Sequence, residues 1–320
     1  MNILQNYRAT GSDLRIPLTV WSRHLRIVFK YGNLRKFKNL SRAYLHYLKG
    51  SLKISTMPAF LKVEISRCCY VRCKYCYEEK ANIFYPFPLY KALIDKLKDY
   101  LFEVSLYDIG EPLLNDNVID YIRYAHSKNL GTIISTSLSV KKPDEFWENI
   151  ILSGLDYLIV SIDGISEKVY KQYRTCGDLH LVLSNLRKLQ AYRSQYNNNL
   201  FIEWQMIDLP WNKHEQKSAK SLSVDLGCDS FRIIPEVTEK RIKYDKEILF
   251  RRKNCLLPFI IFIVNAYNQV RPCYKLYGGN PMIGDLSQST FEEIWNGEEI
   301  SRIRNKYSIR NREYCNTCRE

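Results

Sequence analysis

The segment "EISRCCYVRCKYCYEEK" (residues 64–80) places four cysteines within nine positions, directly after a short apolar run. The chain begins without a basic region followed by an apolar core, the pattern of a signal peptide, so we expect a cytoplasmic protein whose thiols stay reduced. Clustered thiols in such a protein predict metal ligands or catalytic groups rather than disulfides. Within the segment, Cys69, Cys73 and Cys76 have the spacing C-x3-C-x2-C.

Three thiolates on one short loop can hold three irons of a four-iron, four-sulfur cluster, whose usual complement is four thiolates. The fourth iron then keeps an open position that a small molecule can occupy. A structural zinc site is the alternative, because Cys68 could nominally act as a fourth ligand. Adjacent cysteines rarely point into one tetrahedron, so we expect an iron–sulfur cluster on Cys69, Cys73 and Cys76, with Cys68 as a bystander.

The sequence around this segment alternates strand-like and helix-like stretches. The strand-like stretches are 60–65, 101–107, 131–137, 156–162, 200–207 and 230–236. Amphipathic stretches such as 88–100, 116–129 and 143–154 lie between them. Such alternation predicts an α/β fold with a parallel sheet and right-handed crossovers. Six units are too few to close a full barrel, so we expect a partial (β/α)6 TIM-like barrel with its functional groups at the carboxyl ends of the strands.

The first 58 residues form a separate, basic region. Residues 1–50 hold ten Lys or Arg residues and one acid. We predict two basic helices over 18–49, broken near 31–33, because apolar residues recur there at helical spacing. This region is either a segment that binds an anionic membrane surface or a helical extension packed on the main domain with a solvated basic face.

The main domain is predicted over 59–240, and residues 250–320 are predicted to form a small, cysteine-rich α+β appendage. Within the appendage we expect a buried strand in 256–267 and one helix over 289–304, started by a capping box of Thr290 and Glu293. No stretch reaches the roughly 18 apolar residues of a membrane span.

The main domain resembles radical S-adenosylmethionine (SAM) enzymes. Tyr75, the aromatic residue before the last cysteine of the loop, matches the signature of that superfamily. "IGEP" (109–112) resembles its Gly-Gly-Glu-Pro motif without the first glycine, and "STS" (135–137) replaces the more usual Ser-Thr-Asn. "SIDG" and the following "YR" (161–174) resemble the pattern after its fourth strand. The resemblance implies the following SAM-binding residues: Tyr75, Gly110, Glu111, Pro112, Ser135, Thr136, Ser161, Asp163 and Arg174. Ser137 receives no role from it.

The same resemblance implies the cofactors and the reaction. The cofactors are a [4Fe-4S] cluster with three cysteine ligands and S-adenosylmethionine. A reductant such as flavodoxin or ferredoxin would supply one electron, which cleaves SAM to methionine and a 5′-deoxyadenosyl radical. That radical removes a hydrogen atom from a C–H bond of the substrate.

The cysteines of the appendage resemble those of the SPASM/twitch branch of these enzymes. Four of them complete the ligand set of one closed cluster: Cys255, Cys273, Cys315 and Cys318. The resemblance therefore implies one auxiliary [4Fe-4S] cluster, with a zinc knuckle as the alternative.

The substrate is left open between two classes. The basic extension and the absence of a strand-rich leader-binding module favour a carbohydrate, nucleotide-sugar or other small anionic metabolite, which would be oxidised or epimerised. A peptide or protein substrate is the alternative, and a non-catalytic iron–sulfur scaffold or electron carrier is an alternative of another class. Cys176, just beyond the fourth strand, could return a hydrogen atom to the substrate radical. We expect no nucleic-acid partner.

Overall fold

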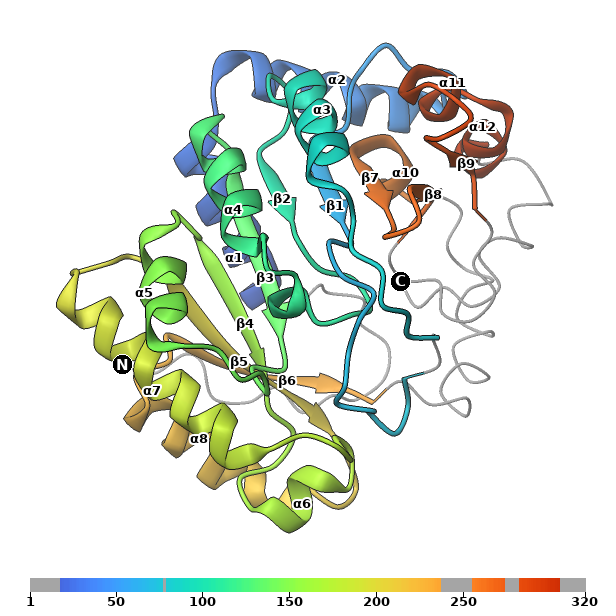
Figure 1. The fold of residues 1–320 in the computed structure, drawn as a ribbon. Helices are drawn as coiled ribbons and strands as arrows, with labels where there is room; N and C mark the ends of the chain where they lie inside the picture. The colour runs from blue at the N-terminus through green and yellow to red at the C-terminus, as the bar shows by residue number, and fades with distance from the viewer. Residues whose placement is uncertain (1–17, 77–78, 237–254, 274–281, 306–320) are drawn as a thin grey trace, which may run out of the picture.

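The computed structural model describes residues 18–76, 79–236, 255–273 and 282–305, with side chains described from residue 23 onward. A single mixed sheet runs through this part of the chain in the order β6-β5-β4-β3-β2-β1-β7-β8-β9 (Figure 1). Its first six strands are all parallel. They are β1 (Phe60–Val63), β2 (Glu103–Ser105), β3 (Gly131–Thr136), β4 (Tyr157–Ser161), β5 (Phe201–Asp208) and β6 (Ser230–Pro235). The predicted partial barrel is confirmed.

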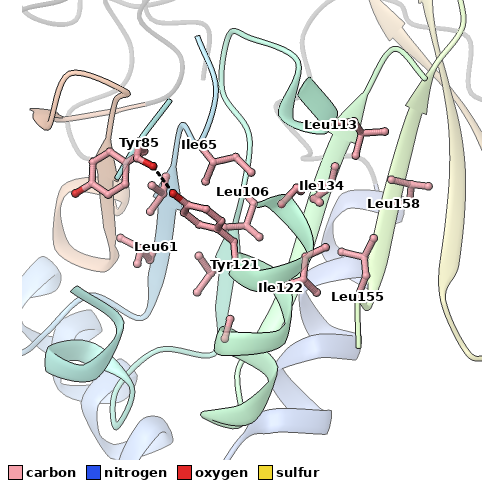
Figure 2. Packing of buried hydrophobic residues seen from close by; sticks show 14 of the residues in the cluster. Leu61, Ile65, Tyr85, Leu106, Leu113, Tyr121, Ile122, Ile134, Leu155 and Leu158 are labelled. Atoms are coloured by element: carbon pink, nitrogen blue, oxygen red, sulfur yellow. Dashed lines mark hydrogen bonds between the residues drawn. The ribbon is translucent and has the colours of Figure 1, made fainter. Parts of the chain in front are cut away.

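Helices follow the strands in the alternating order that the sequence predicts. The longer ones are α3 (Phe87–Leu97), α4 (Val118–Ser127), α5 (Asp144–Leu152), α7 (Leu179–Gln195) and α8 (Gln216–Asp225). The short elements are η1 (Pro112–Leu114), α6 (Glu167–Lys171) and η2 (Lys213–Glu215). Figure 2 shows the core between α4 and the sheet, where Tyr121 and Ile122 of α4 lie beside Leu106, the residue that follows β2. The Tyr121 hydroxyl donates a hydrogen bond to the carbonyl of Tyr85.

The two predicted basic helices are present as α1 (Leu18–Tyr31) and α2 (Leu34–Lys49). Alternate residues of a strand point to opposite faces of a sheet, and α1 covers the face that α3–α8 leave open. Ile27 and Tyr31 of α1 form a second apolar cluster with Ile133, Tyr157 and Ile159. The contact is close, because a Cβ on Gly131 would lie 2.3 Å from a methyl carbon of Ile27. The extension therefore fills the concave side of the partial barrel at the amino ends of its strands.

The C-terminal region continues the main sheet. It contains α10 (Leu257–Ile260), β7 (Ile261–Val264), β8 (Gln269–Arg271), β9 (Gly284–Asp285), α11 (Phe291–Trp295) and α12 (Glu298–Arg304). β7 pairs in parallel with β1, whereas β8 and β9 run antiparallel. The expected strand within 256–267 is shorter than predicted, because its first part, which contains Pro258, forms α10.

The single helix predicted over 289–304 is two helices. The capping box of Thr290 and Glu293 starts α11 as predicted. The helix then ends at Asn296, whose side chain exchanges hydrogen bonds of 2.9 and 3.0 Å with the backbone of Ile54. These tertiary bonds favour a break at Asn296–Gly297 over one continuous helix. Across the described residues, we find no helix with the length and hydrophobicity of a membrane span.

Candidate active site

One pocket lies at the carboxyl ends of β1–β4 and collects most of the predicted site residues. Its lining is Cys69, Arg72, Cys73, Cys76, Lys80, Tyr107, Asp108, Ile109, Gly110, Glu111, Ser135, Thr136, Ser137, Ser161 and Arg174. The three cysteines of the C-x3-C-x2-C loop thus face the same space as residues from three further strand ends. This is the edge of a parallel α/β sheet where ligands bind.

The cysteine loop is held in shape by the segment that follows α6. Cys73 and Arg174 form an isolated antiparallel bridge, and the amide of Lys74 donates to the carbonyl of Tyr173 at 2.8 Å. The amide of Cys176 donates to the carbonyl of Val71 at 2.9 Å. Backbone bonds of this kind fix the path of the loop.

Gly110 allows the loop after β2 to lie directly against the cysteine loop. A Cβ at this position would lie 2.0 Å from the carbonyl oxygen of Ser66, which is far inside van der Waals contact. The next amide, that of Glu111, donates to the carbonyl of Cys68 at 2.7 Å. Only glycine permits this close backbone approach.

Glu111 is buried and clamps the loop after β2 to the end of β3. One carboxylate oxygen accepts hydrogen bonds from the Thr136 hydroxyl at 2.6 Å and the Leu113 amide at 3.2 Å. The other accepts from the amide and hydroxyl of Ser137, at 2.8 and 2.6 Å. Ser137 therefore has a clear structural role, which the sequence comparison could not assign because the usual residue there is asparagine.

Arg174 is held by a buried carboxylate. Its Nε donates to Asp163 Oδ2 at 2.7 Å, and its Nη1 lies 3.7 Å from the sulfur of Cys73. Burial alone would lower the pKa of Arg174, but Asp163 and Cys73 raise it above its ordinary value. The other oxygen of Asp163 accepts from the amide of Ile207 at 2.7 Å, so Asp163 supports Arg174 from beneath and does not line the pocket.

The donor set fits an iron–sulfur cluster. Burial raises the pKa of Cys69 to about 11 and also raises that of Cys73, so the free thiols are protonated near neutral pH. Loading of iron must therefore displace protons from them. Among the described residues, no three His, Cys, Asp or Glu side chains gather at the spacing needed for a single metal ion. A four-iron cluster takes each thiolate on a different iron and does not need that spacing.

Several predicted residues lie outside the pocket lining. Tyr75 lies beside Tyr173 and Trp211, with ring centroids 6.0 and 6.4 Å away. Pro112 begins η1, and Cys176 is exposed. Cys255 and Cys273 are exposed and partly buried, respectively, whereas Cys315 and Cys318 lie outside the described residues.

Asp108 is a pocket residue that sequence reasoning missed. Its carboxylate lies 2.9 Å from Lys62 Nζ on β1 and 3.0 Å from Arg271 Nη1 on β8. Burial would raise the pKa of Asp108, but Lys62 and Arg271 bring it below its ordinary value. Its place at the end of β2, two residues before Gly110, is the signal that could have identified it. Through Arg271, Asp108 connects the pocket to the C-terminal region.

Comparison with known proteins agrees with this geometry. Residues 63–202 match the radical SAM superfamily, and residues 255–319 match the SPASM iron–sulfur cluster-binding domain. The chain therefore carries a radical SAM domain followed by a SPASM domain, which together imply S-adenosylmethionine, a [4Fe-4S] cluster and auxiliary iron–sulfur clusters.

Individual relatives resemble parts of the chain. It is 32% identical over 130 residues to Fe-coproporphyrin III synthase of Methanosarcina barkeri, covering 39% of this chain and 32% of that protein. It is 26% identical over 144 residues to GTP 3′,8-cyclase of Limosilactobacillus fermentum, covering 41% of this chain and 42% of that protein. The chain thus spans less than half the length of these curated relatives. The structure of Streptococcus suis SuiB bound to precursor peptide SuiA shares the fold, with a TM-score of 0.63 and 11% identity, over 99% of this chain and 80% of that one.

Proposed function

We propose that this radical SAM and SPASM protein is an enzyme that removes a hydrogen atom from a C–H bond of a small anionic metabolite, such as a carbohydrate or nucleotide-sugar. When bound, the reduced cluster supplies the electron that splits SAM into methionine and the 5′-deoxyadenosyl radical, which takes the hydrogen atom. The observation that carries the proposal is that Cys69, Cys73 and Cys76 line one pocket together with residues from the ends of β2, β3 and β4.

The residues around the three thiols have distinct proposed roles. Gly110 brings the backbone of its loop close to the cysteine loop, where backbone groups can bind the amino group of SAM. Glu111 keeps that backbone in place through its four hydrogen bonds. Arg174, fixed by Asp163, presents a permanent positive charge that suits the carboxylate of SAM. Ser161, at the end of β4, is proposed to contact the ribose.

The polar character of the concave face supports an anionic substrate. Ser105, Ser135, Ser161, Gln205 and Arg232, which pairs with Glu203 at 2.7 Å, are only partly buried there, whereas residues on the opposite face of the same strands form the apolar core. Arg72 and Lys80 add positive charge to the pocket wall. The two curated relatives are named for small molecules, Fe-coproporphyrin III and GTP, and not for peptides.

A peptide substrate is the second candidate. SuiB, whose fold extends over nearly the whole of this chain, was solved with a precursor peptide bound. At 11% identity, this likeness concerns the fold alone. The choice between a peptide and a small metabolite is therefore made by experiment.

Net oxidation is favoured over epimerisation as the outcome. Epimerisation requires a hydrogen-atom donor beside the substrate radical, and Cys176, the candidate, is exposed and is not part of the pocket lining. Oxidation needs instead the loss of one further electron and one proton from the substrate, and the auxiliary iron–sulfur cluster that the SPASM match implies would accept that electron. If the wild-type enzyme incorporated deuterium from heavy water into its product and Cys176→Ala did not, this assignment would be reversed.

A SAM cleavage assay tests the proposed activity. The chain is reconstituted anaerobically with iron and sulfide and reduced, and 5′-deoxyadenosine is measured by mass spectrometry. We expect Cys73→Ala to abolish 5′-deoxyadenosine formation and Cys68→Ala, which removes a buried thiol of the same segment, to retain it. A wild-type protein that binds iron but releases no 5′-deoxyadenosine would instead be an iron–sulfur scaffold or electron carrier.

A second assay separates the substrate classes. Deuterated sugars and nucleotide-sugars, and separately deuterated peptides, are offered to the reduced enzyme. Transfer of deuterium into 5′-deoxyadenosine identifies the class that donates the hydrogen atom. Transfer only from peptides would overturn the small-metabolite assignment while leaving the radical chemistry intact.

A further inference from the structure

Helix α2 has its apolar side outward. At about 3.6 residues per turn, one arc of about 100° on this helix contains mostly apolar side chains: Leu34, Phe37, Ser41, Tyr44, Leu45 and Leu48. All of them are exposed, with Leu34 at 85% and Leu45 at 52%. We call this arc the α2 stripe. Exposed apolar surface of this extent marks an interaction site on a folded protein.

The opposite side of α2 is buried, with Ala43 fully buried and Tyr47 packed against the core, and hydrogen bonds from two polar residues fix it there. Lys36, only 1% exposed, donates from Nζ to the carbonyls of Tyr31 and Asn129 at 3.0 and 2.9 Å. Asn39 exchanges bonds of 2.8 and 3.0 Å with the backbone of Met57. A helix that simply covered the domain would bury its leucines and expose its lysine, so the orientation of α2 needs another explanation.

Positive charge runs along one side of the stripe. Arg35, Lys38, Arg42 and Lys49 are exposed and share an adjoining arc of the helix. Residues 18–58 contain no aspartate or glutamate, although Arg35 also pairs with Asp99 at 2.9 Å. An apolar stripe beside a basic row is the arrangement of helices that lie in the surface of an anionic bilayer.

We propose that α2 docks this protein onto an anionic lipid surface, with the α2 stripe inserted among the acyl chains and the basic row against the headgroups. Figure 1 shows α2 along an outer edge of the molecule. It packs at the amino ends of the strands, where Phe37 contacts Phe102 just before β2. The pocket lies at the carboxyl ends of the strands, so a bilayer on α2 leaves the pocket open to the aqueous phase.

Vesicle flotation of the cluster-loaded, full-length protein tests this docking. We expect binding to vesicles of phosphatidylcholine mixed with phosphatidylglycerol, weakening as salt is added, and little binding to phosphatidylcholine alone. Leu34→Ser with Leu45→Ser should weaken the binding roughly tenfold or more. Lys38→Gln with Lys49→Gln should weaken it roughly 10- to 30-fold.

Matched controls use the same exchanges elsewhere on the surface. Leu89→Ser with Leu152→Ser removes two exposed leucines from α3 and α5, and Lys217→Gln with Lys220→Gln removes two exposed lysines from α8. Both should bind vesicles like wild type, and all four double variants should keep the wild-type rate of SAM cleavage. Equal binding to both vesicle types, or full binding by the α2 variants, overturns the proposal. So does a lipid-free oligomer that the leucine exchange on α2 dissociates, because the stripe would then be an interface between copies of this chain.

Discussion

The two ends of the parallel strands are built on different principles. At the carboxyl ends, polar side chains and close backbone contacts fix the geometry: Gly110 against Ser66, Glu111 on Ser137, and Arg174 on Asp163. At the amino ends, apolar packing closes the concave face, with Ile27 and Tyr31 of α1 as the central residues. We therefore expect substitutions at the carboxyl ends to lower the rate of SAM cleavage more than the free energy of unfolding. Substitutions at the amino ends should lower the free energy of unfolding alone.

Gly110→Ala is the sharpest test of the carboxyl ends, and we expect the largest effect from it. The new Cβ would overlap the backbone of Ser66, so the loop must move and the bond between Glu111 and Cys68 must lengthen. Misplacement of a binding loop by about 1 Å can cost about 100-fold in rate, and we expect at least that loss of 5′-deoxyadenosine formation. Ile109→Val, in the same loop, should stay within a few-fold of wild type. Activity near wild type in Gly110→Ala would show that the loop is not fixed as described.

Ile27→Ala tests the amino ends. Ile27 is 2% exposed and lies against Gly131, so its truncation leaves a cavity between α1 and the sheet. We expect the free energy of unfolding to fall by about 2–4 kcal/mol, measured by urea denaturation. SAM cleavage per folded molecule should not change. Leu25→Ala, on the exposed side of the same helix, should stay within about 0.5 kcal/mol of wild type. A fall in SAM cleavage by the folded Ile27→Ala protein would mean that α1 also shapes the pocket.

How much the sequence predicted differs between the same two ends. At the carboxyl ends, the cysteine spacing and the Gly-Glu-Pro stretch are local patterns, so nine of the fifteen residues that line the pocket were predicted as site residues, whereas Arg72, Lys80 and Tyr107 were not. Asp108 was not predicted as a site residue because its role depends on Lys62 and Arg271, which are distant in sequence. The role of Ser137 was not predicted because its hydrogen bond to Glu111 joins two loops that are distant in sequence.

At the amino ends, periodicity predicted the two helices but not their placement. An amphipathic pattern shows that a helix has two different sides and does not say which one meets the protein. The expectation that α2 packs on the domain with a solvated basic face holds for the basic row, whereas Lys36 is buried and the apolar stripe is exposed to solvent as well. The partners that decide this, the carbonyls of Tyr31 and Asn129, carry no sequence signature.

The smallest predicted effect concerns Lys36, and it tests the orientation of α2 directly. Burial lowers the pKa of Lys36 from 10.5 to about 8. Between these two values the unfolded chain holds the proton on Lys36 and the folded chain has released it. The contribution of Lys36 to stability is therefore constant below about pH 8 and rises from there to about pH 10.5. Lys36→Met removes this pH-dependent contribution to the free energy of unfolding.

Paired urea titrations of wild type and Lys36→Met, carried out across this pH range, measure the contribution of Lys36 to the free energy of unfolding. The stability of wild type relative to the variant should increase by about 1–3 kcal/mol between about pH 8 and pH 10.5. Lys38→Met, which replaces an exposed lysine two residues further on, is the matched control. A flat difference for Lys36→Met would mean that Lys36 is solvated. In that case α2 would be rotated about its axis and its leucines would face the protein, which would remove the basis for the membrane-docking surface as well.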